Sequence, residues 1–138
     1  MEEIFHEKAT FNAKLTNLYQ ILIWINERIA KYLPERDLDR IELAAEEVIV
    51  NIISHAYKNK NGNIQVQIYV NQCINLIFKD KGPKFNPLIK KNFHRRKNVK
   101  RIGGVGIFLI LRLADEVQYQ RKDDANILIL RMKRNIEY

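Results

Sequence analysis

The sequence lacks most of the features that mark secreted, membrane-embedded or zinc-stabilised proteins. Its one cysteine, Cys73, excludes an internal disulfide bond and fits a reducing compartment. There is no Cys/His spacing of the kind that structural zinc sites use. No apolar run approaches the ~20 residues of a membrane-spanning helix, and the opening MEEIFHEK lacks the apolar stretch of a secretory signal. We therefore expect a soluble, cytoplasmic protein that does not enter a membrane.

Acidic residues are outnumbered by basic ones. Among 138 residues, 24 Lys and Arg stand against 16 Asp and Glu, and the net charge of +8 favours an anionic partner: a nucleotide, a nucleic acid or an acidic protein surface. Much of the excess lies in residues 90–101, KKNFHRRKNVKR, which contain seven basic residues and no acid. This block has no aromatic residue besides Phe93, and no known nucleic-acid-binding motif occurs in the chain. A nucleic-acid-binding module is therefore the weaker interpretation, and we expect no direct contact with nucleic acid.

The spacing of apolar residues predicts alternating strands and helices in a single domain over residues 1–138, without a linker or an internal repeat. The expected strands cover residues 3–11, 64–70, 73–79, 116–121 and 126–133, and the expected helices cover residues 12–33, 39–57 and 107–115. The first helix should bury a stripe of Leu15, Leu18, Leu22, Ile25 and Ile29, and the second should open on a capping box of Asp39 and Glu42. Short turns between neighbouring strands imply antiparallel pairing. The sequence thus predicts an α/β (α+β) two-layer sandwich, a mixed, mostly antiparallel sheet with about three helices on one face.

The second helix, ELAAEEVIVNIISHAY at residues 42–57, carries an unusual pair of polar residues. Glu47 and Asn51 are four residues apart, so they share one helix face with Cβ atoms roughly 6 Å apart. Asn is a mediocre helix former, because its amide competes for backbone hydrogen bonds. Its oxygen can ligate Mg²⁺, and a nearby carboxylate can accept or orient a proton. The alternative is that both are merely exposed polar residues.

A second polar stretch, DKGPKF at residues 80–85, ends an expected strand. Asp80 can accept a hydrogen bond from an exocyclic amine such as that of adenine, and Gly82 lets the backbone approach a flat ring closely. The alternative is a plain strand-ending turn, since Asp, Gly and Pro all favour turns. The irregular stretch from Asp80 to Gly106 is long for a compact domain, which favours a functional loop.

A third stretch, GGVGIF at residues 103–108, opens the expected short helix. Glycines at a helix start present free backbone N–H groups that suit a phosphate. The stretch is not a Walker A loop, because no Gly-Lys-Ser/Thr follows, and it matches the Rossmann pattern poorly, because no strand precedes it. The alternative is a glycine-rich helix start that binds nothing.

The order of these three stretches resembles that of the GHKL (Bergerat-fold) ATP-binding proteins. The chain is most similar to their stand-alone anti-sigma factor and serine kinase group, the RsbW and SpoIIAB type. Members read EE…N…HAY, then D-x-G-x-x-F-x-P, then GG-x-G-I/L before an apolar helix and L-x-D-E-V. The matching stretches here are residues 46–57, 80–87 and 103–117, so the resemblance spans essentially the whole chain.

The resemblance implies a role for residues in the first two stretches. Asn51 would hold Mg²⁺, and Glu47 would be the catalytic carboxylate that faces the substrate hydroxyl. Asp80 would bind the adenine amine, with Gly82 beside the ring. ATP and Mg²⁺ are therefore the expected cofactors.

The family resemblance also implies which residues surround the phosphates of ATP. Gly104 and Gly106 would line the phosphates, and residues 84–102 would form a lid over ATP. Because it lies next to the glycines, Arg101 is a candidate cation for phosphate contact.

The resemblance further implies a bacterial partner-switching regulator. Such a protein would hold a sigma factor inactive, phosphorylate a Ser or Thr of an anti-anti-sigma (STAS-type) antagonist, and form a homodimer. The alternative is a binding-only regulator that binds ATP without transferring phosphate. The presence of Glu47 favours the kinase.

Overall fold

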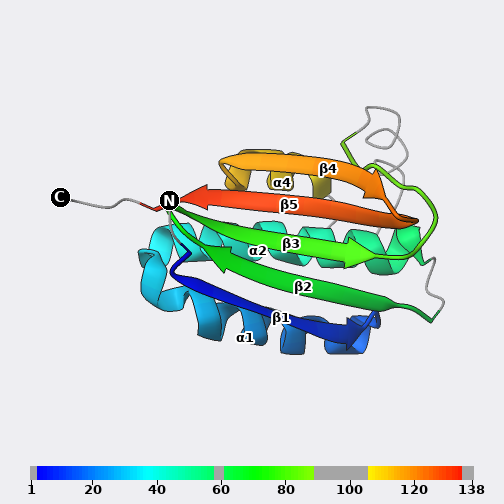
Figure 1. Ribbon diagram of the computed structural model, residues 1–138, viewed down its shortest axis with the longest axis horizontal. Coiled ribbons are helices and arrows are strands. Elements are labelled where there is room, and N and C mark those ends of the chain that lie inside the picture. Colours follow the sequence, from blue (N-terminus) through cyan, green and yellow to red (C-terminus); the bar gives the residue numbers. More distant parts are fainter. Residues whose placement is uncertain (1–2, 58–60, 89–105, 135–138) are drawn as a thin grey trace.

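The protein is built from two layers, a sheet and the helices that cover one of its faces (Figure 1). The computed structural model describes residues 3–57, 61–88 and 106–134. The strands are β1 (Phe5–Asn12), β2 (Asn63–Val70), β3 (Cys73–Asp80), β4 (Glu116–Lys122) and β5 (Ala125–Lys133). The helices are α1 (Leu18–Ile29), α2 (Glu35–Asn51) and α4 (Gly106–Leu113), with short helical turns at η1 (Leu15–Asn17), η2 (Ala30–Tyr32) and η3 (Ile52–Ala56). The predicted two-layer sandwich is confirmed.

The sheet has five strands in the order β1-β2-β3-β5-β4, and all four pairings are antiparallel. The sequence predicted a mixed, mostly antiparallel sheet, whereas the described strands form antiparallel pairs throughout. The reason is that β5 lies between β3 and β4, which run in the same direction without touching as a pair. The β4–β5 connection is a two-residue turn in which Asp123 and Asp124 have φ of 52° and 61°. This left-handed conformation matches the twist of a hairpin, and Asp tolerates it.

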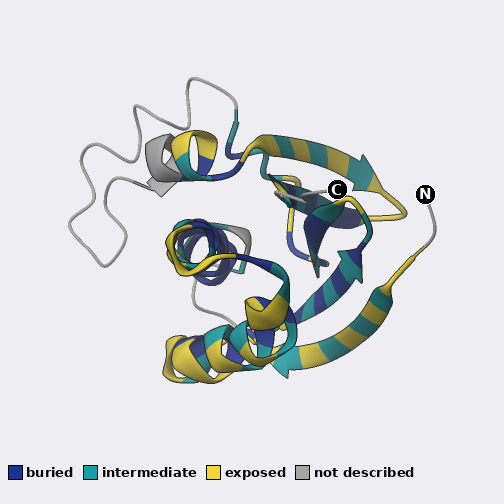
Figure 2. Cartoon of the chain, turned by 90° about the vertical axis from the view of Figure 1, so that its left-hand side faces the viewer, coloured by how far each residue is buried: buried dark blue, intermediate teal, exposed yellow. Residues whose placement is uncertain are grey.

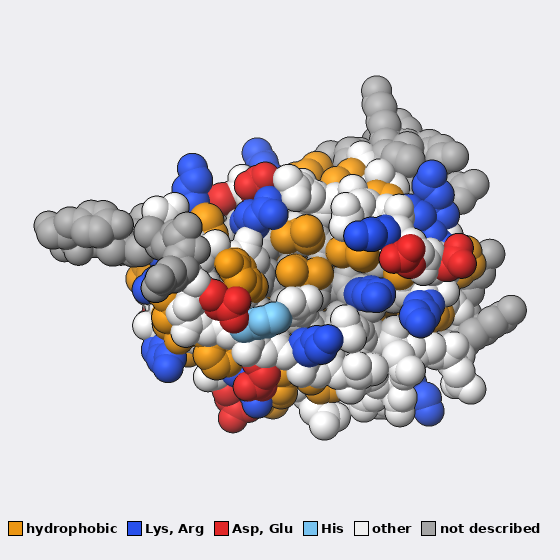
Figure 3. All heavy atoms as spheres, viewed as in Figure 1, with side chains coloured by type: hydrophobic (Ala, Val, Ile, Leu, Met, Phe, Trp, Pro, Cys, Tyr) orange, Lys and Arg blue, Asp and Glu red, His pale blue; other side chains and the backbone are white. Residues whose placement is uncertain are grey.

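The core lies between the sheet and the helices, where buried residues of both layers face each other (Figure 2). Strand β2 alternates as predicted, with Ile64, Val66, Ile68 and Val70 fully buried. On the opposite, outward face of the sheet, hydrophobic side chains lie among Lys, Arg, Asp and Glu (Figure 3). The alternation therefore sets which face of the sheet receives the helices.

The helices differ from the sequence prediction at their starts. Helix α1 buries Leu18, Ile21, Ile25 and Ile29, whereas Leu15 is 49% exposed, because it lies in the preceding turn η1. The capping box expected at Asp39 and Glu42 is wrong, because α2 begins one turn earlier, at Glu35 after Pro34. The extended backbone of Pro34 marks the N-terminal end of the helix. Two acidic residues in the first turn, Glu35 and Asp37, interact favourably with the helix dipole. Among the described residues, no helix combines the length and hydrophobicity needed to cross a bilayer.

Candidate nucleotide-binding site

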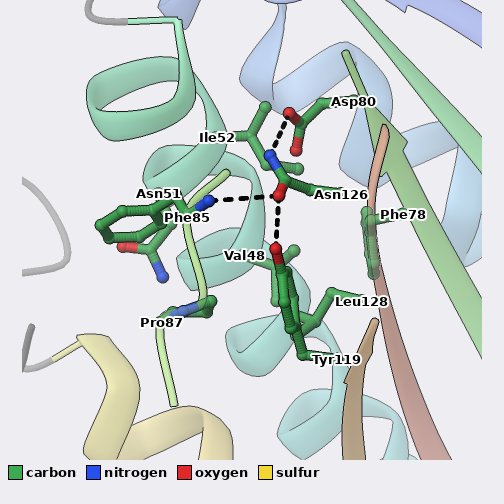
Figure 4. Close-up of a pocket in the computed structure, with 10 residues that line it drawn as sticks. All are labelled: Val48, Asn51, Ile52, Phe78, Asp80, Phe85, Pro87, Tyr119, Asn126 and Leu128. Atoms are coloured by element: carbon green, nitrogen blue, oxygen red, sulfur yellow. Dashed lines mark hydrogen bonds between the residues drawn. The ribbon is translucent and has the colours of Figure 1, made fainter. Parts of the chain in front are cut away.

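One pocket brings together residues from α2, the turn after it, three strands and the segment that follows β3 (Figure 4). Its lining residues are Val48, Asn51, Ile52, Phe78, Asp80, Phe85, Pro87, Tyr119, Asn126 and Leu128. Most are apolar or aromatic, and the polar exceptions converge from different elements. This is the usual composition of a small-molecule site.

Helix α2 carries Glu47 and Asn51 into the interior. Each is only 3% exposed, so the alternative of two exposed polar residues is wrong. The helix is buried on several sides because it lies beneath the sheet and packs against both α1 and α4. Within the described part of the chain, neither Oδ1 nor Nδ2 of Asn51 has a hydrogen-bond partner. Leaving a buried amide unpaired costs on the order of 1–3 kcal/mol, so this side chain fits a group that a ligand or a Mg²⁺ ion would satisfy.

The end of α2 changes its winding at the pocket. Residues Ile52–Ala56 form a π-helical turn, a feature that often marks functional sites. His55 stacks on Phe85 with ring centroids 5.0 Å apart and planes at 10°. The Tyr57 hydroxyl accepts a hydrogen bond from the Lys81 backbone N–H at 2.9 Å and donates one to the Asn63 carbonyl at 2.7 Å. The helix end therefore holds the segment that follows β3.

Asp80, the last residue of β3, is 4% exposed and faces the pocket. Its Oδ1 accepts hydrogen bonds from the Gly82 backbone N–H and from Asn126 Nδ2, both at 2.9 Å. Burial raises the pKa of the Asp80 carboxyl, and these two bonds together with the Arg121 charge lower that pKa in part. The turn suggested for this stretch is present, since Gly82 bonds back to Asp80. It does not exclude a ligand, because both bonds converge on Oδ1 and leave Oδ2 as an acceptor.

Sequence reasoning missed three residues beside Asp80: Asn126, Tyr119 and Arg121. The strand register explains why they gather, because Asn126 pairs with Asp80 across β3–β5 and with Arg121 across β4–β5. Arg121 donates to the Gly82 carbonyl at 2.7 Å, and the Tyr119 hydroxyl donates to Asn126 Oδ1 at 2.6 Å. One signal was available: Asn126 is a polar residue in phase with the buried Leu128, Leu130 and Met132 of β5.

The third stretch is described only from its last glycine. Gly106 begins α4, as predicted for a glycine-rich helix start. Gly104 and Arg101 lie outside the described residues, as does the predicted lid beyond Leu88. The C-terminal end of α4 is joined to α2 by a hydrogen bond from Arg40 to the Arg112 carbonyl at 3.3 Å.

The family model described as the histidine kinase-like ATPase domain matches residues 11–132. The chain belongs to this family. The family resemblance seen in the sequence is therefore confirmed, and the pocket lies within the matched region of this histidine kinase-like ATPase domain.

Relatives of this ATPase domain include curated proteins named "Serine-protein kinase RsbW". The chain is 31% identical over 100 residues to one from Staphylococcus aureus (strain bovine RF122 / ET3-1), and 30% identical over 100 residues to one from strain MSSA476. Each match covers 66% of this chain and 63% of the relative. The chain thus spans less than two thirds of the length of these relatives.

Solved structures show the same ATPase fold at low identity. The RsbU and RsbW domains of Rv1364c from Mycobacterium tuberculosis superimpose with a TM-score of 0.67 and 15% identity, covering 94% of this chain and 32% of that one. The catalytic domain of the histidine kinase ThkA superimposes with a TM-score of 0.56 and 16% identity, covering 95% of this chain and 99% of that one. At such identities the likeness concerns the fold alone.

Proposed function

We propose that the protein binds ATP in this pocket and phosphorylates a Ser or Thr of a partner protein. One observation carries the proposal: Asn51, with its buried and unpaired amide, and Asp80, with an acceptor oxygen to spare, line the same pocket. The matching family is described as an ATPase domain, which supports ATP as the ligand, and the relatives named as serine-protein kinases support the class of reaction.

Asp80 and the apolar wall would hold the base. The spare Oδ2 of Asp80 would accept a hydrogen bond from the adenine amine. Val48, Phe78 and Leu128 line the same pocket and offer apolar surface to the flat faces of a purine. Gly82, two residues after Asp80, has no side chain and would let the backbone lie beside the ring.

Asn51 and the start of α4 would face the phosphates. When bound, Mg-ATP supplies the γ-phosphoryl group, with the metal offsetting its charge. Asn51 would contribute an amide oxygen to the metal, which accepts few protein ligands when phosphates provide others. The backbone N–H groups at Gly106, and those of Gly104 before it, would donate to phosphate oxygens at the positive end of the helix. Arg101 would add a positive charge, and residues 84–102 would cover the nucleotide.

Glu47 would act on the attacking hydroxyl. It lies one turn before Asn51 on the same helix and is equally buried. A carboxylate at that place can accept the hydroxyl proton or orient the hydroxyl for in-line attack. Burial of α2 between the sheet and its neighbouring helices would hold this side chain in one position.

We infer the partners from the family resemblance. The phosphorylated protein would be a STAS-type anti-anti-sigma antagonist, and the second partner would be a sigma factor held inactive. A homodimer in the cytoplasm is the expected form. The RsbW-type resemblance supports these partners, and the name of the relatives, serine-protein kinase, supports the class of reaction.

A phosphotransfer assay tests the proposal. The protein would be incubated with radiolabelled ATP, Mg²⁺ and the STAS-domain protein from the same cell, and label should appear on a Ser or Thr of that protein. Omitting Mg²⁺ should abolish labelling. ATP binding without any transfer would instead establish the binding-only regulator.

Replacing Asn51 by alanine should remove Mg²⁺-dependent nucleotide binding without unfolding the protein. The substitution breaks no hydrogen bond among the described residues and removes an unpaired buried amide, so thermal stability should stay the same or rise. Calorimetric titration with Mg-ATP and a thermal melt measure the two effects.

Asn75 provides a matched control for this substitution. It is also buried, at 7% exposed, but its amide bonds to the Tyr69 carbonyl and accepts from Arg131, away from the pocket. Asn75→Ala should therefore lower stability and leave nucleotide affinity intact. Unchanged Mg-ATP affinity in Asn51→Ala would contradict the metal-binding role.

A further inference from the structure

The side chain of Asn126 uses its full capacity for hydrogen bonding. Its Nδ2 donates to Asp80 Oδ1 at 2.9 Å and to the Pro83 carbonyl at 2.9 Å. Its Oδ1 accepts from the Phe85 backbone N–H at 3.2 Å and from the Tyr119 hydroxyl at 2.6 Å. An amide has two N–H donors and one oxygen with two lone pairs, so all four positions are used. The residue is 5% exposed, and these bonds compensate for its burial.

The partners fix the orientation of this amide. The opposite orientation would turn its oxygen towards the Asp80 carboxylate and the Pro83 carbonyl, which are both acceptors. It would also turn its NH₂ group towards the Phe85 N–H, which is a donor. Since each of these contacts would be repulsive, only one orientation satisfies the site.

We propose that Asn126 is a positioning residue that couples adenine recognition by Asp80 to the placement of residues 82–87, the segment that follows β3. The proposal rests on the function proposed above, in which Asp80 binds adenine. The Asn126 side chain holds Oδ1 of Asp80, so that Oδ2 is left for the pocket, and it also holds the Phe85 backbone N–H (Figure 4). Its second N–H holds the Pro83 carbonyl. Moving the segment must therefore disturb the carboxylate, and a ligand that fixes the carboxylate must steady the segment.

The segment is held from several directions, but its contacts differ in what they join. Arg121 holds the Gly82 carbonyl from β4, and His55 stacks on the Phe85 ring from the helix end. Tyr57 accepts the Lys81 N–H. Asn126 is the side chain that contacts both Asp80 and the backbone beyond Gly82 in the described hydrogen bonds. The Gly82 N–H donates directly to Asp80 Oδ1, so the start of the segment is joined to the carboxylate without Asn126. Coupling between Asp80 and the backbone at Pro83 and Phe85 passes through Asn126.

The substitution Asn126→Asp tests the coupling with a pH signature. It keeps the size of the side chain and replaces the donating NH₂ with an oxygen that lies 2.9 Å from Asp80 Oδ1 in the present geometry. Two carboxyl groups so close share one proton, and the pair loses that proton only at unusually high pH. While the proton is held, the new acid can donate to Asp80 as the amide does. A carboxylic acid has only one O–H, so the Pro83 carbonyl loses its donor in the variant at every pH. Once the proton is lost, the two negative charges also repel each other.

The affinity for adenosine, measured by NMR titration from pH 5 to pH 8, should respond accordingly. Adenosine is the probe because it has no phosphates that titrate in this range. In Asn126→Asp the affinity should stay close to that of the wild type at the acid end and fall by at least about tenfold towards the alkaline end. The ionisable neighbours His55, Tyr119 and Arg121 are present in both proteins, so the difference between the two profiles isolates the carboxyl pair.

Asn75→Asp is the matched control, because it also places a carboxyl on a buried strand position but beside Arg131 and away from the pocket. The adenosine affinity of Asn75→Asp should change with pH in the same way as that of the wild type. A second measurement needs no variant: saturating adenosine should slow hydrogen exchange at the Phe85 amide, which donates to Asn126. The coupling would be overturned if the adenosine affinity of Asn126→Asp changed with pH as that of the wild type does. It would also be overturned if adenosine left the hydrogen-exchange rate of the Phe85 amide unchanged.

These outcomes are distinct from failure of the proposed function. If the Asp80→Asn variant bound adenosine as tightly as the wild type does, the assignment of adenine to Asp80 would be wrong. If Asp80→Asn lost adenosine while Asn126→Asp behaved like the wild type at every pH, only the coupling would fall.

Discussion

Replacing Glu47 by alanine should lower the rate of phosphoryl transfer by ~10²–10⁴-fold, the usual scale for a positioned proton acceptor. A group that acts on the attacking hydroxyl matters mainly in the transition state, so nucleotide affinity should stay nearly intact. The variant should bind Mg-ATP like the wild type, keep its sigma-type partner and fail to label the antagonist. Single-turnover transfer and calorimetric titration separate the two quantities.

Glu46 is the internal control for this substitution. It is the neighbouring residue, about 100° away around the helix. It lies in the groove between α1 and α2 with Tyr19 and Leu43 and does not line the candidate site. Glu46→Ala should therefore leave the transfer rate nearly unchanged. If Glu46→Ala abolished transfer and Glu47→Ala did not, the catalytic carboxylate would be misassigned. If neither substitution mattered, the binding-only regulator would stand.

Asp80→Asn should weaken ATP binding by at least tenfold, because a hydrogen bond to a buried charged group contributes roughly 1.5–3 kcal/mol. The structure also predicts how the new amide is oriented. The Gly82 N–H and Asn126 Nδ2 both donate to Oδ1, so the carbonyl oxygen of the variant must occupy that place. Its NH₂ group would then replace Oδ2 and point a donor at the adenine amine, which is also a donor.

The same geometry predicts a change of base preference. Guanine has an oxygen where adenine has the amine, so GTP should bind the wild type poorly and Asp80→Asn comparatively better. Competition of ATP and GTP for a fluorescent nucleotide, in wild type and variant, measures this shift. Equal competition by GTP and ATP in the wild type would show that Asp80 does not recognise the base.

Much of the fold could be predicted because the responsible signals are local. Alternation in β2 identified both the strand and its buried face, and the short turns implied antiparallel pairing. The start of α2 was mispredicted because Asp39 and Glu42 have the spacing of a cap, while the actual start depends on the extended conformation of Pro34. Local pattern could not choose between two acceptable helix starts.

The site could be predicted only in part. Asn51 and Asp80 were singled out because each occurs in a short motif of a few residues, and both line the pocket. Glu47 was singled out for the same reason and is buried, while its catalytic role stays a prediction. Asn126 was not singled out, because its importance arises from the β3–β5 register that places it opposite Asp80. That register depends on packing across the whole sheet, and a single polar residue in a strand does not reveal it.

The strand order has a consequence for how freely the connection between β3 and β5 can vary in length. The central strands β3 and β5 pair along their whole lengths, yet the chain that joins them runs through residues 81–124 and includes α4 and β4. The entropy of closing such a loop grows only with the logarithm of its length, so doubling a flexible stretch costs about 0.6 kcal/mol. Insertions or deletions beyond Leu88 would therefore leave the register of β3 and β5 untouched. The length of this stretch can therefore change at little cost in folding free energy, and if it covers the nucleotide as proposed, such changes would alter how long the nucleotide stays bound.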